Sequence, residues 1–163
     1  MELKFKGSTI KTNGSFPKVG DKLPEMRLVN TDLSELNTKD LKGKKVVFNI
    51  FPSVDTAVCA VQLNKFSAQL KNREDVALVF TSLDLPFAFG RFCAAEGIDN
   101  AITVSDYRYR DANQLGAVME GGPLSGLHAR GVIVTDEDLT VQYAELVEEV
   151  TNEPNYEAAL AKL

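Results

Sequence analysis

Lys45-Val46-Val47-Phe48-Asn49-Ile50-Phe51-Pro52-Ser53-Val54-Asp55-Thr56-Ala57-Val58-Cys59 is the stretch of sequence that decides the fold. The dense apolar run from Val46 to Phe51 is typical of a buried strand, which Pro52-Ser53 breaks. A helix is expected next, because apolar residues then recur at the spacing of one helical face, namely Cys59, Leu63, Phe66 and Leu70. The stretch therefore predicts a buried strand leading directly into an amphipathic helix.

The same alternation continues toward the carboxyl end. We predict a strand over 76–83 and then a helix that begins at Pro86 and ends at Gly97, with one face formed by Phe89, Phe92, Cys93 and Glu96. Short strands are predicted over 101–104, 131–135 and 141–146, the last two joined by a turn at 136–138. A final helix follows Pro154, and its apolar stripe is Tyr156, Ala159, Leu160 and Leu163.

The residues before this unit predict a short hairpin. Leu3–Phe5 and Thr9–Lys11 flank Gly7-Ser8, and the segment from Phe16 to Pro24 reads as an irregular connection. The complete order predicts an α/β domain over residues 1–163, with a thioredoxin-like mixed β-sheet flanked by helices and an N-terminal β-hairpin. The periodicity alone also fits other small α/β folds.

Composition excludes several classes of function. The 163 residues hold 18 Lys and Arg against 23 Asp and Glu, a net charge of −5 that disfavours nucleic acid as a partner. The apolar runs are far shorter than the ~20 residues that span a membrane, and the first residues lack a secretory signal, so we expect a cytoplasmic protein. Two Cys and one His are too few for a zinc site, and we expect no metal and no cofactor.

Cys59 occupies the position where chemistry is expected. It follows the carboxyl end of a predicted buried strand, where α/β folds place their ligands. If Thr56 is the N-cap, Cys59 is the third residue of the helix, and the free N–H groups and helix dipole there favour a thiolate. The alternative is that Cys59 is a small apolar residue packed beside Leu63 and Phe66.

The motif resembles that of a known family. Pro52-x-x-x-Thr56-x-x-Cys59 is similar to the active-site motif of the peroxiredoxins, and the residues from Phe51 to Thr56 resemble their thiol peroxidase branch. In that branch a second cysteine lies in the helix after the next strand, where this sequence has Cys93, 34 residues downstream. Arg130, in Leu127-His128-Ala129-Arg130-Gly131-Val132, matches the family's catalytic arginine.

This resemblance, which covers essentially the whole chain, implies a peroxidase of the atypical two-cysteine type. Cys59 would attack hydrogen peroxide or an organic or lipid hydroperoxide, and Cys93 would resolve the product through an intramolecular disulfide. Thr56, Arg130 and the Cys59 amide would bind the peroxide, and Pro52 would shield the sulfur from water. The resemblance further implies thioredoxin as reductant and a homodimer.

Acidifying a thiol does not by itself make a fast peroxidase. Lowering a thiol pKa from about 8.5 to about 6 raises the thiolate fraction about 13-fold near neutral pH. A Brønsted slope of about 0.4–0.5 removes roughly 10–20-fold of the intrinsic nucleophilicity over the same range. The rate must therefore come from groups that orient the O–O bond and stabilise the departing oxygen.

Several alternatives remain open at this point. Cys93 could be a packing residue beside Phe89 and Phe92, or half of a permanent disulfide with Cys59. We predict instead two forms, because cysteines on inward helix faces are bridged only after a helix turn unwinds. A non-enzymatic redox sensor on the same scaffold is the alternative function. A thioredoxin-type oxidoreductase is disfavoured because its cysteines are two residues apart, and His128 is expected to be structural.

Overall fold

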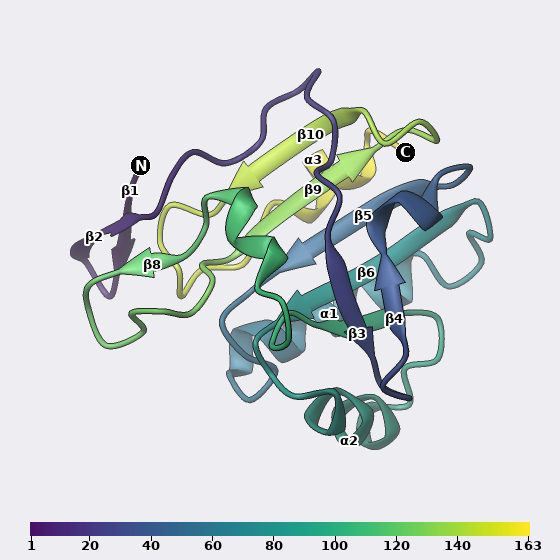
Figure 1. Ribbon diagram of the computed structural model, residues 1–163, viewed down its shortest axis with the longest axis horizontal. Coiled ribbons are helices and arrows are strands. Elements are labelled where there is room, and N and C mark those ends of the chain that lie inside the picture. Colours follow the sequence, from purple (N-terminus) through teal and green to yellow (C-terminus); the bar gives the residue numbers. More distant parts are fainter.

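Seven strands form the central sheet of the computed structural model, which describes residues 1–163 (Figure 1). Their order is β10-β9-β5-β6-β7-β3-β4, with β5, β6 and β7 parallel and the other neighbours antiparallel. The bounds are β3 (Arg27–Asn30), β4 (Glu35–Asn37), β5 (Lys45–Ile50), β6 (Val76–Ser82), β7 (Ile102–Ser105), β9 (Gly131–Thr135) and β10 (Val141–Leu146). A smaller sheet joins β1 (Glu2–Phe5), β2 (Ser8–Thr12) and β8 (Met119–Glu120).

Each face of the sheet carries its own buried cluster of apolar residues. Figure 1 shows α1 (Ala57–Gln69) and α3 (Tyr156–Leu160) behind the sheet, and the segment that carries the 3-10 helix η2 (Asp111–Leu115) in front. One buried cluster packs these α-helices and α2 (Pro86–Glu96) against the sheet, and a second fills the opposite face. A further 3-10 helix, η1 (Thr38–Leu41), precedes β5. None of the helices has the length and hydropathy needed to cross a membrane.

Most of the predicted elements are confirmed, together with the thioredoxin-like class. β9 and β10 have the predicted bounds, β5 begins and ends one residue before its predicted bounds, and β6 ends one residue early. Pro86 is the first residue of α2, and Gly97 ends it in the left-handed conformation (φ 67°). The N-terminal hairpin turns at Lys6 and Gly7, which both have positive φ, as a tight two-residue turn requires.

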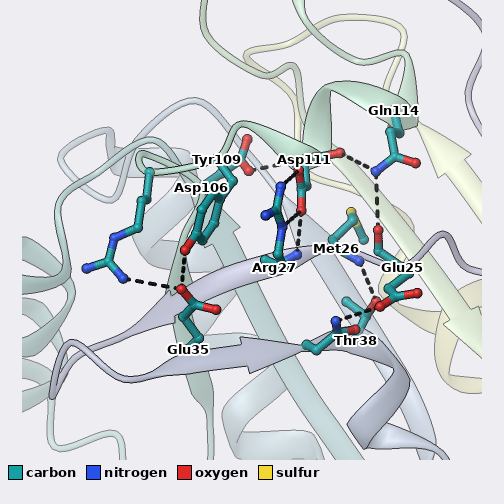
Figure 2. A network of polar contacts seen from close by, with 12 residues as sticks. Glu25, Met26, Arg27, Glu35, Thr38, Asp106, Tyr109, Asp111 and Gln114 are labelled. Carbon is teal, nitrogen blue, oxygen red and sulfur yellow. Dashed lines mark hydrogen bonds and ion pairs between the residues drawn. The ribbon is translucent and has the colours of Figure 1, made fainter.

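The strands β3 and β4 were not predicted from the sequence. Arg27 of β3 makes the contacts that attach this edge to the segment after β7 (Figure 2). Its Nε donates to Asp111 Oδ2 at 2.8 Å, and its guanidinium carbon lies 3.9 Å from the centre of the Tyr109 ring. Tyr109 also donates to Glu35 of β4. The edge therefore depends on pairs of residues about 70 to 85 positions apart in the chain.

Candidate active site

The nucleophile position lies at the junction of β5 and α1. Thr56 is the N-cap of α1 and has an extended backbone, so Cys59 is the third helical residue, as predicted. The Thr56 hydroxyl, however, accepts no capping hydrogen bond from the first turn and instead donates to the carbonyl of Ser53 at 2.9 Å. Cys59 is fully buried and belongs to the apolar cluster of Leu63 and Phe66, so the packing expected of a small apolar residue is real.

The sulfur of Cys59 also has a polar contact, with the side chain of Arg130. Its Nη1 donates to Cys59 Sγ at 3.1 Å, and the whole arginine is only 2% exposed. A guanidinium stays charged under all ordinary conditions, so this contact places a cation directly on the sulfur. The geometry required for an anionic sulfur therefore exists in the folded chain.

The start of β9 explains the position of Arg130. Gly131 pairs with Ile50, the last residue of β5, so Arg130 lies just beyond that end of the sheet. A Cβ on Gly131 would lie 2.7 Å from Cζ of Phe16, so only glycine allows this ring to pack against the backbone. Arg130 Nε itself donates to the carbonyl of Val150 at 3.1 Å.

A buried polar chain fixes the arginine from inside the core. Arg130 Nη1 also donates to Gln62 Oε1 at 3.0 Å, and Gln62 Nε2 donates to Asn49 Oδ1 at 2.7 Å. Asn49 Nδ2 donates in turn to the carbonyl of Val79 at 3.1 Å. Gln62 and Asn49 are fully buried, and sequence reasoning missed both. Their signal was available, since each is an amide within an otherwise apolar stretch, where an unpaired polar group would be costly.

We predict that replacing Gln62 with leucine slows the reaction of the Cys59 sulfur with peroxide about tenfold, because hydrogen bonds to charged groups contribute ~1.5–3 kcal/mol. Arg130 would lose the acceptor that orients Nη1, and Asn49 would lose a donor. Stopped-flow measurement of the second-order rate constant checks this. Gln69, exposed on the same helix, provides the matched control, and Gln69→Leu should react like the wild type. Equal rates for both variants would contradict the role of Gln62.

The remaining predicted site residues lie in two different places. Pro52 is buried at the end of β5, beside the loop that leads to Thr56. Cys93 lies on α2 and is half-buried, with its Sγ 4.0 Å from Thr103 Oγ1. Burial raises the pKa of the Cys93 thiol. Both cysteines are free thiols, so the form described by the structure has no disulfide. Glu96, predicted on the same face as Cys93, is exposed.

His128 has a structural environment. It is fully buried, and its Nε2 lies 2.9 Å from Oδ2 of Asp106, which is also fully buried. Asp106 Oδ1 accepts from the amide of Ala112, so the pair connects the strand entry to η2. These contacts agree with the structural role expected from the sequence.

Comparison with known proteins places this geometry in a family. Residues 18–160 match the Redoxin family model. The chain is 51% identical over 159 residues to a thiol peroxidase of Corynebacterium glutamicum, covering 98% of this chain and 96% of the relative. It is 43% identical to a thiol peroxidase of Vibrio cholerae over the full length of both chains.

Two solved structures have the same fold as this chain. A peroxiredoxin-like protein from Aquifex aeolicus superposes with a TM-score of 0.94 at 38% identity, covering 99% of this chain and 94% of the other. A thiol peroxidase from Chromobacterium violaceum shares the fold, with a TM-score of 0.89 at 21% identity over 99% of this chain and 94% of that one. The chain therefore belongs to the redoxin family and, within it, to the thiol peroxidases, which are oxidoreductases of the peroxiredoxin type.

Proposed function

We propose that this protein reduces hydrogen peroxide and organic or lipid hydroperoxides at Cys59, resolves the product with Cys93, and is recycled by thioredoxin. The observation that carries the proposal is the 3.1 Å contact between Arg130 Nη1 and Cys59 Sγ in a site closed to water. Family membership supports the peroxidase activity, and the contact supports the assignment of the sulfur that performs it.

The first step is a two-electron oxidation of sulfur. The Cys59 thiolate attacks one oxygen of the hydroperoxide, the O–O bond breaks, and the other oxygen departs as alkoxide or hydroxide and takes a proton from water. Cys59 becomes a sulfenic acid. Negative charge moves from the sulfur to the departing oxygen during this step, so a fixed cation beside both atoms stabilises the transition state.

Arg130, Thr56 and Pro52 have distinct roles in this proposal. Arg130 supplies the cation without acting as a base. Because the Thr56 hydroxyl already donates its proton to the carbonyl of Ser53, its oxygen is left to accept a hydrogen bond from the peroxide O–H. Pro52 is buried and has no N–H, so it closes one side of the sulfur to water. Since Cys59 is fully buried, a local movement must admit the peroxide.

The second step joins the two cysteines. The Cys93 thiol attacks the sulfenic sulfur, a disulfide forms, and the hydroxyl leaves as water. Burial raises the pKa of the Cys93 thiol, which disfavours the reactive thiolate while the side chain is packed against β7. Movement of Cys93 out of this packing would remove that cost, which supports a locally rearranged oxidised form. Thioredoxin then reduces the disulfide by thiol–disulfide exchange, returning both thiols.

The test compares wild-type protein with Cys93→Ser. Reduced wild type mixed with hydrogen peroxide or an organic hydroperoxide should lose the Cys59 thiolate rapidly and turn over when thioredoxin and its reductase are present. Cys93→Ser should be oxidised at the same rate but stop after one equivalent of peroxide, because no internal thiol resolves the sulfenic acid. Stopped-flow kinetics and intact mass follow both steps.

Two results would contradict the proposal. Undiminished thioredoxin-supported turnover by Cys93→Ser would remove Cys93 as the resolving residue. Oxidation of wild-type Cys59 at the rate of an ordinary thiol, without turnover, would favour the redox sensor instead.

We also propose a homodimer in the cytoplasm. Support for pairing comes from apolar side chains at the start of α2, beside the active-site loop: Leu85 is 51% exposed and Phe87 is 67% exposed. Large apolar groups clustered on a surface favour association.

A further inference from the structure

Asp84 lies just before α2, which carries Cys93, and its carboxylate contacts the loop before α1, which carries Cys59. Asp84 follows β6 and is partly buried. Its Oδ1 accepts from the Ser53 hydroxyl at 2.7 Å, and its Oδ2 accepts from the Val54 amide at 2.8 Å. The Ser82 hydroxyl, at the end of β6, also donates to Oδ2. One side chain thus binds the loop before α1 at two points and is itself anchored on the sheet.

The loop held by Asp84 is the one that positions the peroxide site. Ser53 Oγ accepts from the Asp55 amide at 3.1 Å, and the Ser53 carbonyl accepts from both the amide and the hydroxyl of Thr56. The Thr56 carbonyl then accepts from Ala60 in the first turn of α1. A continuous series of hydrogen bonds therefore leads from Asp84 to the helix end that carries Cys59.

A second polar contact, an ion pair between α2 and this loop, is weaker than the hydrogen bonds of Asp84. Arg91 pairs with Asp55 at 3.1 Å, but both side chains are 69% exposed, and exposed ion pairs contribute little. Hydrogen bonds to a partly buried carboxylate are about twice as strong as neutral ones. Asp84 is therefore the principal polar anchor of the loop.

Asp84 is also connected to the second cysteine through the chain. It lies two residues before Pro86, the first residue of α2, and α2 carries Cys93. A rearrangement that brings Cys59 and Cys93 together must change the distance between the loop and α2, and the Asp84 hydrogen bonds resist that change. The hydrogen bonds that keep the loop in its peroxide-reactive position therefore also oppose the movement that disulfide formation requires.

We propose that Asp84 is a positioning residue that favours the peroxide-reactive form of the loop and is released before the Cys59–Cys93 disulfide forms. The proposal rests on the function proposed above. It gives Asp84 a different effect on sulfenic acid formation than on disulfide formation. Loss of the carboxylate should slow formation of the sulfenic acid, because small misplacements of reacting groups are costly. The same loss should leave disulfide formation as fast as in the wild type, or faster.

The experiment measures both rate constants in Asp84→Ala, Asp84→Asn and the wild type by stopped flow with hydrogen peroxide. We expect sulfenic acid formation to fall about tenfold in Asp84→Ala. Asp84→Asn keeps one oxygen for the Val54 amide and should fall about threefold, a partial rescue. Asp99, exposed after α2 and without an ion-pair or hydrogen-bond partner, provides the control, and Asp99→Ala should match the wild type in both steps.

A double-mutant cycle with Ser53→Ala tests the contact itself. If Ser53 and Asp84 act through their hydrogen bond, the double variant should lose little more than Asp84→Ala alone. Should Asp84→Ala fail to fold, Asp84→Asn and Ser53→Ala carry the same comparison.

A proportional fall of both rate constants in the Asp84 variants would mean a merely structural role and would overturn the inference, as would wild-type rates in both. Failure of the proposed function itself is separate, because wild-type protein would then show no rapid oxidation by peroxide.

Discussion

Replacing Cys59 with serine should abolish peroxide reduction while leaving the protein folded. Serine is close in size to cysteine, and its hydroxyl could still accept the hydrogen bond from Arg130 that the sulfur now accepts. An alcohol, however, is not ionised at neutral pH and does not form the sulfenic acid that conserves the oxygen transferred from peroxide. The loss should therefore be chemical rather than structural.

Peroxide consumption with thioredoxin and its reductase measures this loss, and circular dichroism with thermal unfolding checks the fold. Cys93→Ser is the matched control, because it removes the other thiol but should still consume one equivalent of peroxide. Intact mass should show an added oxygen on Cys93→Ser and none on Cys59→Ser. Turnover by folded Cys59→Ser would transfer the peroxidatic role to another residue and remove the assignment.

The central part of the fold could be predicted because its strands are buried on both faces. Such strands leave continuous apolar runs, and β9 was predicted residue for residue. The strands β3 and β4, at one end of the sheet, have four and three residues, of which only Leu28 and Val29 are buried, so no long apolar run marks them. Their place in the sheet depends on the pairing of β3 with β7 and on the contact of Arg27 with Asp111, and contacts between residues that far apart leave no local pattern.

The candidate site could be predicted only in part. Thr56 and Cys59 lie in one local motif, and Arg130 was found by its similarity to a family. Asn49, Gln62 and Asp84 were not found, because their roles depend on side chains meeting across three elements of the fold. The sequence offered only the fact that Asn49 and Gln62 are polar residues in apolar surroundings.

The burial of Cys93 could be predicted only roughly from helical periodicity. Helical periodicity predicts an inward face for this residue, but only Pro86 and Phe89 of α2 are buried. Phe89 is consequently the fully buried member of the predicted face, whereas Phe92 and Cys93 are half-buried. In the proposed second step, where Cys93 leaves its packing to react, partial exposure would reduce the buried apolar surface that α2 exposes on opening.

Replacing Arg130 with methionine should slow the first step about 10²–10³-fold, which is the usual loss when a donor to developing negative charge is removed. Methionine fills much of the same volume, so the variant tests the charge and its hydrogen bonds. The carbonyl of Val150 and Oε1 of Gln62 would each lose a donor, and stability should fall by about 1–3 kcal/mol for a buried acceptor left unpaired. Stopped-flow kinetics below the melting temperature separate the two effects.

Two companion variants make the Arg130 result specific. Arg130→Lys keeps the charge, but a single ammonium cannot reproduce the fork that reaches Val150, Cys59 and Gln62 together, so its rate should lie between those of wild type and Arg130→Met. Arg73→Met removes an exposed arginine paired with Asp75 and controls for net charge. If Arg130→Met kept the wild-type rate constant, the 3.1 Å contact with Cys59 would serve the fold alone, and the transition-state charge would have to be stabilised by backbone N–H groups.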